Sequence, residues 1–137
     1  MGVRLQSLEV RKPGDYEVAF QAAVHEQAEA LIVIGGRFQS LNRHRIGDFV
    51  EKNRLIMVGV PEFLMEIGGL LSYGPNVPEL FRRSATYVDK ILKGAKPTDL
   101  PMQQPITFEL SINLKAARRL GITLPPTVIA RADKVID

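Results

Sequence analysis

Three short apolar runs, each followed by glycine or proline, most constrain the fold of this chain. The first, Leu31–Ile34, is wholly apolar, rich in β-branched residues, and stops at a pair of glycines. The second, Leu55–Val60, stops at a proline, and a third strand is predicted at Gly69–Tyr73. Runs this short and apolar are typical of strands covered on both faces in a parallel sheet. A buried helical turn is the alternative, and the shortness of the runs disfavours it.

Helical patterns lie between these runs. We expect one helix to begin at an Asp15 cap and to end near Ala28, and a second to begin at a Ser40 cap. The inward-facing residues of the second helix are Ile46, Phe49 and Val50. The alternation of strand and helix over residues 3–60 predicts right-handed βαβ units, and therefore an α/β fold with a mostly parallel sheet.

The two ends of the chain contribute further strands. Apolar residues alternate imperfectly over Val3–Val10, which predicts a strand near a sheet edge with one wetter face. Near the other end, Phe108, Leu110 and Ile112 alternate as a final strand, followed by a short helix that Asn113 caps and Gly121 ends. A last helical turn is predicted at residues 128–132.

The most regular helical pattern follows the third run. Asn76 and Glu79 have the spacing of a helix cap and its third-position partner, and Gly94 is placed to end the helix. The apolar stripe of this helix consists of Leu80, Phe81, Ser84, Ala85, Val88, Ile91 and Leu92. The prolines at 97, 101 and 105 then predict an extended crossing over a surface, because proline suits neither a helix interior nor a central strand.

Composition narrows the function. The 137 residues fit one domain, and a formal charge of +3 comes from scattered basic residues, so no nucleic-acid footprint is visible. The absence of cysteine excludes disulfides and thiolate chemistry. No run reaches the roughly 20 apolar residues of a membrane span, and the first ten residues do not resemble a signal peptide. As written, the chain is therefore expected to be cytoplasmic.

No motif specifies a reaction. Gly35-Gly36 lacks the third glycine of a dinucleotide fingerprint, and neither a P-loop nor a nucleophile elbow is present. The lone residues His25 and His44 are interpreted as solvent-exposed rather than as ligands or bases. The acidic residues interpreted as solvated charges are Asp48, Glu62 and Glu66. We therefore predict no enzyme activity, no metal and no cofactor.

Ligands of open parallel sheets bind at the carboxyl ends of the strands, where backbone amides and helix N-termini converge. This rule selects the loops that follow the three apolar runs. The candidate ligand-binding residues are Gly36, Arg37, Phe38, Pro61, Glu62, Ser72 and Tyr73. The alternatives are that Tyr73 packs under the next helix and that Phe38 and Phe63 belong to the core, which is favoured for both phenylalanines.

Longer stretches of the second half carry a family resemblance. They read Gly-Gly-Leu-Leu-Ser-Tyr-Gly-Pro at 68–75, Tyr-Val-Asp-Lys-Ile-Leu-Lys-Gly-Ala-Lys-Pro-Thr-Asp-Leu-Pro at 87–101, and Phe-Glu-Leu-Ser-Ile-Asn-Leu-Lys-Ala-Ala-Arg-Arg-Leu-Gly-Ile at 108–122. The chain ends in Pro-Pro-x-x-x-x-Arg-Ala-Asp-Lys-Val-Ile. Together they resemble the ABC transporter substrate-binding family that includes tryptophan- and tyrosine-type solute receptors.

The resemblance implies a type I periplasmic binding protein fold, in which two Rossmann-like lobes close around a solute. This chain looks like the C-terminal lobe from its second strand onward, a three-layer α/β/α unit whose first strand and helix are missing. Residues 1–94 would be the lobe core, and 95–137 the crossing segment, last strand and short helices. The implied partners are a small solute such as an amino acid and an ABC permease, at a periplasmic or extracytoplasmic location. The loops 34–38 and 59–63 depart from the family pattern, so the resemblance does not indicate which solute would bind.

The missing strand has a physical consequence. In a 2-1-3-4-5 strand order it would lie between residues 3–10 and Leu31–Ile34, so its absence should separate them and leave backbone groups unpaired. We expect the chain either to pair its first strand elsewhere or to form a homodimer across surface that the absent lobe would cover. Two alternatives stay open. One is a small Rossmann-like nucleotide-binding or catalytic protein, and the other is an effector-sensing or interaction module.

Overall fold

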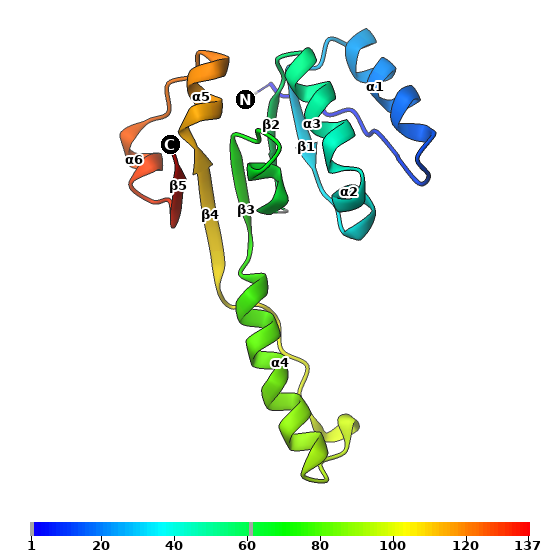
Figure 1. Cartoon of the computed structure of the whole chain (residues 1–137), viewed down its shortest axis with the longest axis vertical. Helices are drawn as coiled ribbons and strands as arrows, with labels where there is room; N and C mark the ends of the chain where they lie inside the picture. Colours follow the sequence, from blue (N-terminus) through cyan, green and yellow to red (C-terminus); the bar gives the residue numbers. More distant parts are fainter. Residues whose placement is uncertain (1, 61) are drawn as a thin grey trace.

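The computed structural model describes residues 2–60 and 62–137, and it is built around one five-stranded sheet (Figure 1). The strands are β1 (Ala30–Val33), β2 (Ile56–Gly59), β3 (Leu71–Pro75), β4 (Phe108–Asn113) and β5 (Lys134–Ile136). Their spatial order follows the sequence, and every neighbouring pair is parallel except β3 and β4. The predicted α/β class with a mostly parallel sheet is confirmed. Strand β5 was not predicted, because three residues at a chain end carry little periodicity.

Helices cover both faces of the sheet. They are α1 (Asp15–His25), α2 (Arg37–Leu41), α3 (Arg43–Lys52), α4 (Val77–Leu92), α5 (Leu114–Leu120) and α6 (Pro126–Ile129), with short 3-10 turns η1 (Glu62–Met65) and η2 (Pro97–Asp99). The main core lies between the sheet and α1, α3 and η1, around the fully buried Met57 and Leu64. A smaller core joins Leu70 to Ala116 and Ala117 of α5. This is the predicted three-layer arrangement.

Two predicted helix caps are wrong. Ser40 lies inside α2, and Asn42 separates α2 from α3. Asp15 is the first residue of α1 rather than its cap, and its carboxylate accepts hydrogen bonds from the backbone of the preceding loop, from Arg11 (3.0 Å) and Lys12 (3.1 Å). Helix α1 also ends earlier than predicted, because Gln27 adopts a left-handed φ of 55°.

The strand predicted at Val3–Val10 is absent, and this expectation is wrong. Side chains hold the segment to α1 instead: the Arg4 guanidinium lies 3.0 Å from the Glu26 carboxylate and donates to the Glu26 carbonyl oxygen at 3.1 Å. Residues 3–10 belong to no strand pair, so the separation from β1 occurs as expected, whereas the alternative pairing elsewhere does not. Strand propensity produces no strand here because no neighbouring backbone offers a ladder.

An arm, defined as residues 76–107, projects from the body formed by the remaining residues (Figure 1). Its helix α4 is capped as predicted, since Asn76 Oδ1 accepts from the Glu79 amide at 2.7 Å. Gly94 follows the helix with a φ of 98°. The returning segment lies along α4, where the Tyr87 hydroxyl donates to the Pro101 carbonyl oxygen at 2.7 Å.

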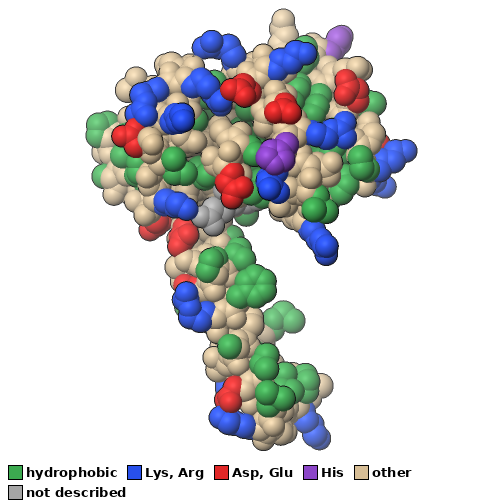
Figure 2. Space-filling model, in the orientation of Figure 1, with side chains coloured by type: hydrophobic (Ala, Val, Ile, Leu, Met, Phe, Trp, Pro, Cys, Tyr) green, Lys and Arg blue, Asp and Glu red, His purple; other side chains and the backbone are tan. Residues whose placement is uncertain are grey.

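The apolar stripe of α4 is exposed. No residue of α4 is buried, and Phe81 and Leu92 are 75% and 82% exposed. Figure 2 shows hydrophobic side chains along one side of the arm, whereas charged side chains are scattered over the body. In the described part of the chain nothing covers this stripe. Within the same residues, no helix is both long enough and apolar enough to cross a membrane.

Candidate functional site

A cleft of about 560 Å³ lies where the first strands of the sheet end, and we call it the carboxyl-end cleft. It is bounded by the loops after β1 and β2, by β3 and β4, and by the start of α4. Its apolar lining includes Val60, Phe63 and Val77. The position is the one that ligand sites of open α/β sheets occupy.

The pairing of β3 with β4 builds the floor of this cleft. Ser72 lies opposite Ser111 in the antiparallel register, and Gly74 lies opposite Glu109. Because side chains alternate along a strand, these four residues share one face of the sheet. Both serines are buried, and the Ser72 hydroxyl donates to the Val60 carbonyl oxygen at 3.3 Å. The floor therefore carries hydroxyl groups beside an apolar wall.

Glu109 is the ionisable residue among the described residues that line the cleft. The Asn76 side-chain amide donates to the Glu109 carboxylate, while the Asn76 oxygen caps α4. One asparagine thus fixes both the start of the arm and the position of the carboxylate. A half-buried carboxylate beside hydroxyls and apolar side chains suits a small solute with a cationic or hydrogen-bond-donating group and an apolar part.

The absence of a side chain at Gly74 gives the cleft its shape. A Cβ atom on Gly74 would lie 2.6 Å from the Val60 carbonyl oxygen, so only glycine lets the end of β2 approach β3 this closely. At the first loop, the Gly36 amide donates to the Gln39 side chain at 3.1 Å. Because that amide already has a partner and α2 has only five residues, this loop does not form the phosphate cradle of a nucleotide site.

The structure brings together only part of the predicted site. Gly36 and Ser72 line the cleft, whereas Arg37, Phe38 and Tyr73 do not. Phe38 stacks against the core residue Tyr16 at 5.9 Å between ring centroids, which agrees with the core alternative. Tyr73 faces the opposite side of β3, where β-strand alternation places it.

The remaining candidates also differ in whether they lie at the cleft. Tyr73 is 56% exposed and stacks on Phe108 at 5.7 Å, so it does not pack under α4. Pro61 lies outside the described residues, and Glu62 begins η1 with a side chain that is not described. Phe63 packs against the main core and also lines the cleft.

The sequence analysis did not identify Ser40, Glu109 and Ser111 as cleft residues, and it selected the loop that contains Gly74 without naming that glycine. A signal for two of them existed, because the predicted alternation of Phe108, Leu110 and Ile112 leaves Glu109 and Ser111 on the other face of the same strand. What the pattern did not contain was the identity of the neighbouring strand. Only the antiparallel pairing with β3 brings these side chains beside Ser72.

The remaining titratable candidates are exposed. His25, His44 and Asp48 all lie at the surface, and Glu66 forms an open ion pair with Arg43 at 3.8 Å. The described residues contain no cluster of three or more side chains that could hold a metal ion.

Comparison with known proteins places the chain in a family. The model of the ABC transporter substrate binding protein family matches residues 1–136. The chain belongs to this family. A search of curated proteins finds no match.

Three solved structures are similar to this member of the ABC transporter substrate-binding family. A conserved domain protein from Vibrio cholerae O1 biovar El Tor is 27% identical with a TM-score of 0.81, over 89% of this chain and 41% of that one. An ABC domain from Streptococcus pneumonia, solved in complex with L-Trp, is 24% identical with a TM-score of 0.86, over 96% and 45%. A ligand-free, open substrate binding protein with adhesive properties from Clostridium difficile is 16% identical with a TM-score of 0.62, over 93% and 42%. This chain therefore spans less than half the length of each.

Proposed function

We propose that this chain supplies one wall of the solute site in a two-lobed receptor of an ABC importer. The observation that carries the proposal is the carboxyl-end cleft, in which the buried Ser72 and Ser111 lie beside the Glu109 carboxylate in a chain of the substrate-binding family. A solute with an amino group and an apolar side, such as an amino acid, fits this chemistry. The chain would bind and release this solute without catalysis.

The chain would act as the C-terminal lobe, with residues 1–94 as its core and 95–137 as the crossing and final elements. Two findings support the assignment to one lobe of a larger receptor: the chain spans under half of each solved neighbour, and the arm exposes an apolar helix that projects from the body. In the whole receptor, a second lobe would cover the arm and close over the cleft by a hinge motion. The closed form would then be presented to a permease on the extracytoplasmic side of the membrane.

One wall provides only part of the contacts that a closed receptor would make, so we expect the 137-residue chain to bind its solute weakly. Dissociation constants of about 1 mM or more, equivalent to about 4 kcal/mol or less of binding free energy, are expected. Calorimetry should therefore detect no tight binding of amino acids. Tight binding to this chain alone would contradict the one-wall proposal.

A titration followed by nuclear magnetic resonance tests the site itself. Adding L-tryptophan or another amino acid to the isotope-labelled chain should shift the amide signals of Gly36, Ser72 and Ser111. The variant Ser111→Ala should reduce these shifts. The matched control Ser84→Ala removes an exposed hydroxyl on the arm that donates to the Leu80 carbonyl oxygen, and it should leave the shifts unchanged.

Two results would refute the proposed site. One is that shifts appear elsewhere on the body while Ser72 and Ser111 stay unaffected across a panel of amino acids. The other is that a nucleotide, rather than any amino acid, raises the thermal midpoint of the chain, since only a ligand of the native state stabilises it.

A further inference from the structure

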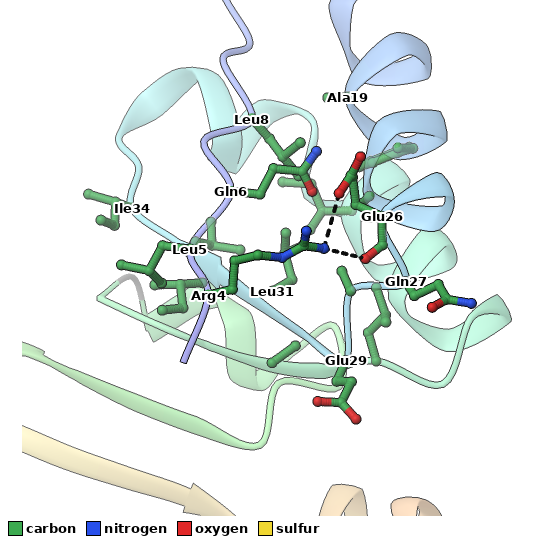
Figure 3. A pocket seen from close by; sticks show the side chains of 18 of the residues that line it. Arg4, Leu5, Gln6, Leu8, Ala19, Glu26, Gln27, Glu29, Leu31 and Ile34 are labelled. Atoms are coloured by element: carbon green, nitrogen blue, oxygen red, sulfur yellow. Dashed lines mark hydrogen bonds and ion pairs between the residues drawn. The ribbon is translucent and has the colours of Figure 1, made fainter. Parts of the chain in front are cut away.

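Two clefts of similar volume differ in the charges beside them. The first, of about 550 Å³, lies between residues 2–10 and β1, and there the Arg4 guanidinium is 3.0 Å from the Glu26 carboxylate (Figure 3). The opening strand that the family resemblance implies would fill this gap, so the gap belongs to the fold rather than to a ligand. The second is the carboxyl-end cleft, where no described residue forms an ion pair with Glu109. The Glu109 carboxylate therefore keeps its negative charge available to a ligand.

The partner of the Glu109 carboxylate is a neutral group. The Asn76 side-chain amide donates to it from the point where the chain leaves β3 for α4. A carboxylate offers about four lone-pair sites, so one hydrogen bond from a neutral amide occupies part of it and does not cancel its charge. Glu109 can therefore bind a cationic group while it keeps its bond to Asn76.

Three further hydrogen bonds hold Asn76 in place. Its backbone amide donates to the Thr107 carbonyl oxygen at 3.0 Å, next to the start of β4. Its side-chain oxygen accepts from the Glu79 amide at 2.7 Å, and its backbone carbonyl oxygen accepts from the Leu80 amide at 3.1 Å. The oxygen and the nitrogen of an asparagine side chain belong to one planar amide. The cap of α4 therefore fixes the direction of the N–H group that reaches Glu109.

We propose that Asn76 is a positioning residue that couples the carboxylate of the solute site to the first turn of the arm. This inference rests on the proposed function. While α4 is capped, the Asn76 amide holds Glu109 in one orientation at the cleft, and a cationic group bound to Glu109 in turn secures Asn76 as the cap. A glutamate that is held before the ligand arrives loses less side-chain freedom on binding, so the contact favours solutes with a protonated amine.

Hydrogen exchange tests the coupling without any solute. Asn76→Ser keeps a cap oxygen, but its hydroxyl is one bond shorter than the amide nitrogen and does not replace it at Glu109. Glu109→Ala should speed exchange of the Glu79 amide about threefold to tenfold in the parent chain and should have no such effect in the Asn76→Ser background. The conservative variant Glu109→Gln keeps an oxygen that accepts from Asn76, so it should retain the slow exchange.

The cap of α5 is the internal control for these variants. The Asn113 side chain accepts from the Ala116 amide at 2.9 Å, and exchange at Ala116 should stay the same in all of them. An equal effect of Glu109→Ala with and without Asn76, or no effect in either background, would overturn the coupling. An effect at Ala116 as large as that at Glu79 would assign the change to the whole sheet and would overturn it as well.

Two probes of similar shape test the effect on ligand selection. Phenethylammonium carries a cationic group, and 2-phenylethanol has a hydroxyl in its place. In titrations that follow the Ser72 and Ser111 amide signals, Asn76→Ser should weaken phenethylammonium binding about twofold to tenfold, because the freed Glu109 side chain must then be ordered on binding. Binding of 2-phenylethanol should stay unchanged. Equal weakening of both probes would overturn the positioning role. If neither probe shifts these signals in the parent chain, the proposed site is refuted, and the exchange measurements decide the coupling by themselves.

Discussion

Helices α3 and α4 have similar sequence patterns and opposite surroundings. In α3 the predicted inward residues Ile46, Phe49 and Val50 are all buried against the sheet. In α4 the apolar stripe is equally regular, yet no residue is buried. Periodicity therefore predicts a helix and its apolar face, whereas the burial of that face depends on the tertiary structure around it. An exposed apolar stripe of this length is typical of a surface that binds a partner.

The largest contrast is expected between two phenylalanines. Phe49 is 9% exposed and stacks on Phe20 with ring centroids 4.0 Å apart, so Phe49→Ala should lower the free energy of unfolding by about 3 to 5 kcal/mol. Phe81→Ala on the arm should change it by about 0.5 kcal/mol or less. Urea unfolding followed by circular dichroism measures both. Equal losses would show that the stripe of α4 is covered in the isolated chain.

A smaller contrast is expected between the two asparagine caps. Asn113 is buried and its side chain accepts from the Ala116 amide at 2.9 Å, so Asn113→Ala should lower the global free energy of unfolding by about 1 to 2 kcal/mol. Asn76→Ala should cost about 1 kcal/mol, felt mainly within α4. Hydrogen exchange separates the two, because the arm variant should speed exchange in residues 77–92 and leave β1 and β2 unchanged. Faster exchange throughout the sheet would indicate that arm and body unfold together.

The smallest effect is expected from acid. The hydrogen bond from the Arg11 amide, with that from Lys12, holds the pKa of Asp15 below its ordinary value of 3.8. Its contribution to stability is present above the unfolded pKa and is lost as the pH falls through the lower folded value. Asp15→Asn should therefore flatten the dependence of the thermal midpoint on pH below about 3.8.

The arm provides the control for this acid effect. Asp89 pairs with Lys93 on the same exposed helix at 2.9 Å, so Asp89→Asn should leave the pH dependence of body unfolding as it is in the parent chain. An identical pH profile for the parent chain and Asp15→Asn would show that the loop hydrogen bonds contribute nothing to folding.

Most helix boundaries could be predicted from residues close to them in the sequence. The caps Asn76 and Asn113 and the terminating glycines Gly94 and Gly121 were predicted correctly, because each acts within one helical turn of its own position. The strand at residues 3–10 was wrong for the opposite reason, since a strand exists only where a neighbouring backbone completes it. The cap predicted at Ser40 was wrong because a hydroxyl residue before apolar helix positions resembles an N-cap even when it lies inside a helix, as Ser40 does in α2.

The candidate site was predicted to the level of its loops. The rule that ligands bind at the carboxyl ends of strands led to Gly36 and Ser72. It did not lead to Glu109 and Ser111, because they enter the site from a strand that runs the other way and lies far along the sequence. Tyr73 was selected because it belongs to the same loop as Ser72, without regard to the alternation of side chains along a strand. In β3, Ser72 faces the cleft and Tyr73 therefore faces the opposite side of the sheet.

Strands β3 and β4 form the cleft floor and are also the two struts that carry the arm (Figure 1). Any tilt of the arm against the body would shear this pair along its length, and the Ser72–Ser111 and Gly74–Glu109 rows would shift with it. A partner that bound α4 and tilted the arm would therefore also change the distances between the Ser72 and Ser111 hydroxyls and the Glu109 carboxylate.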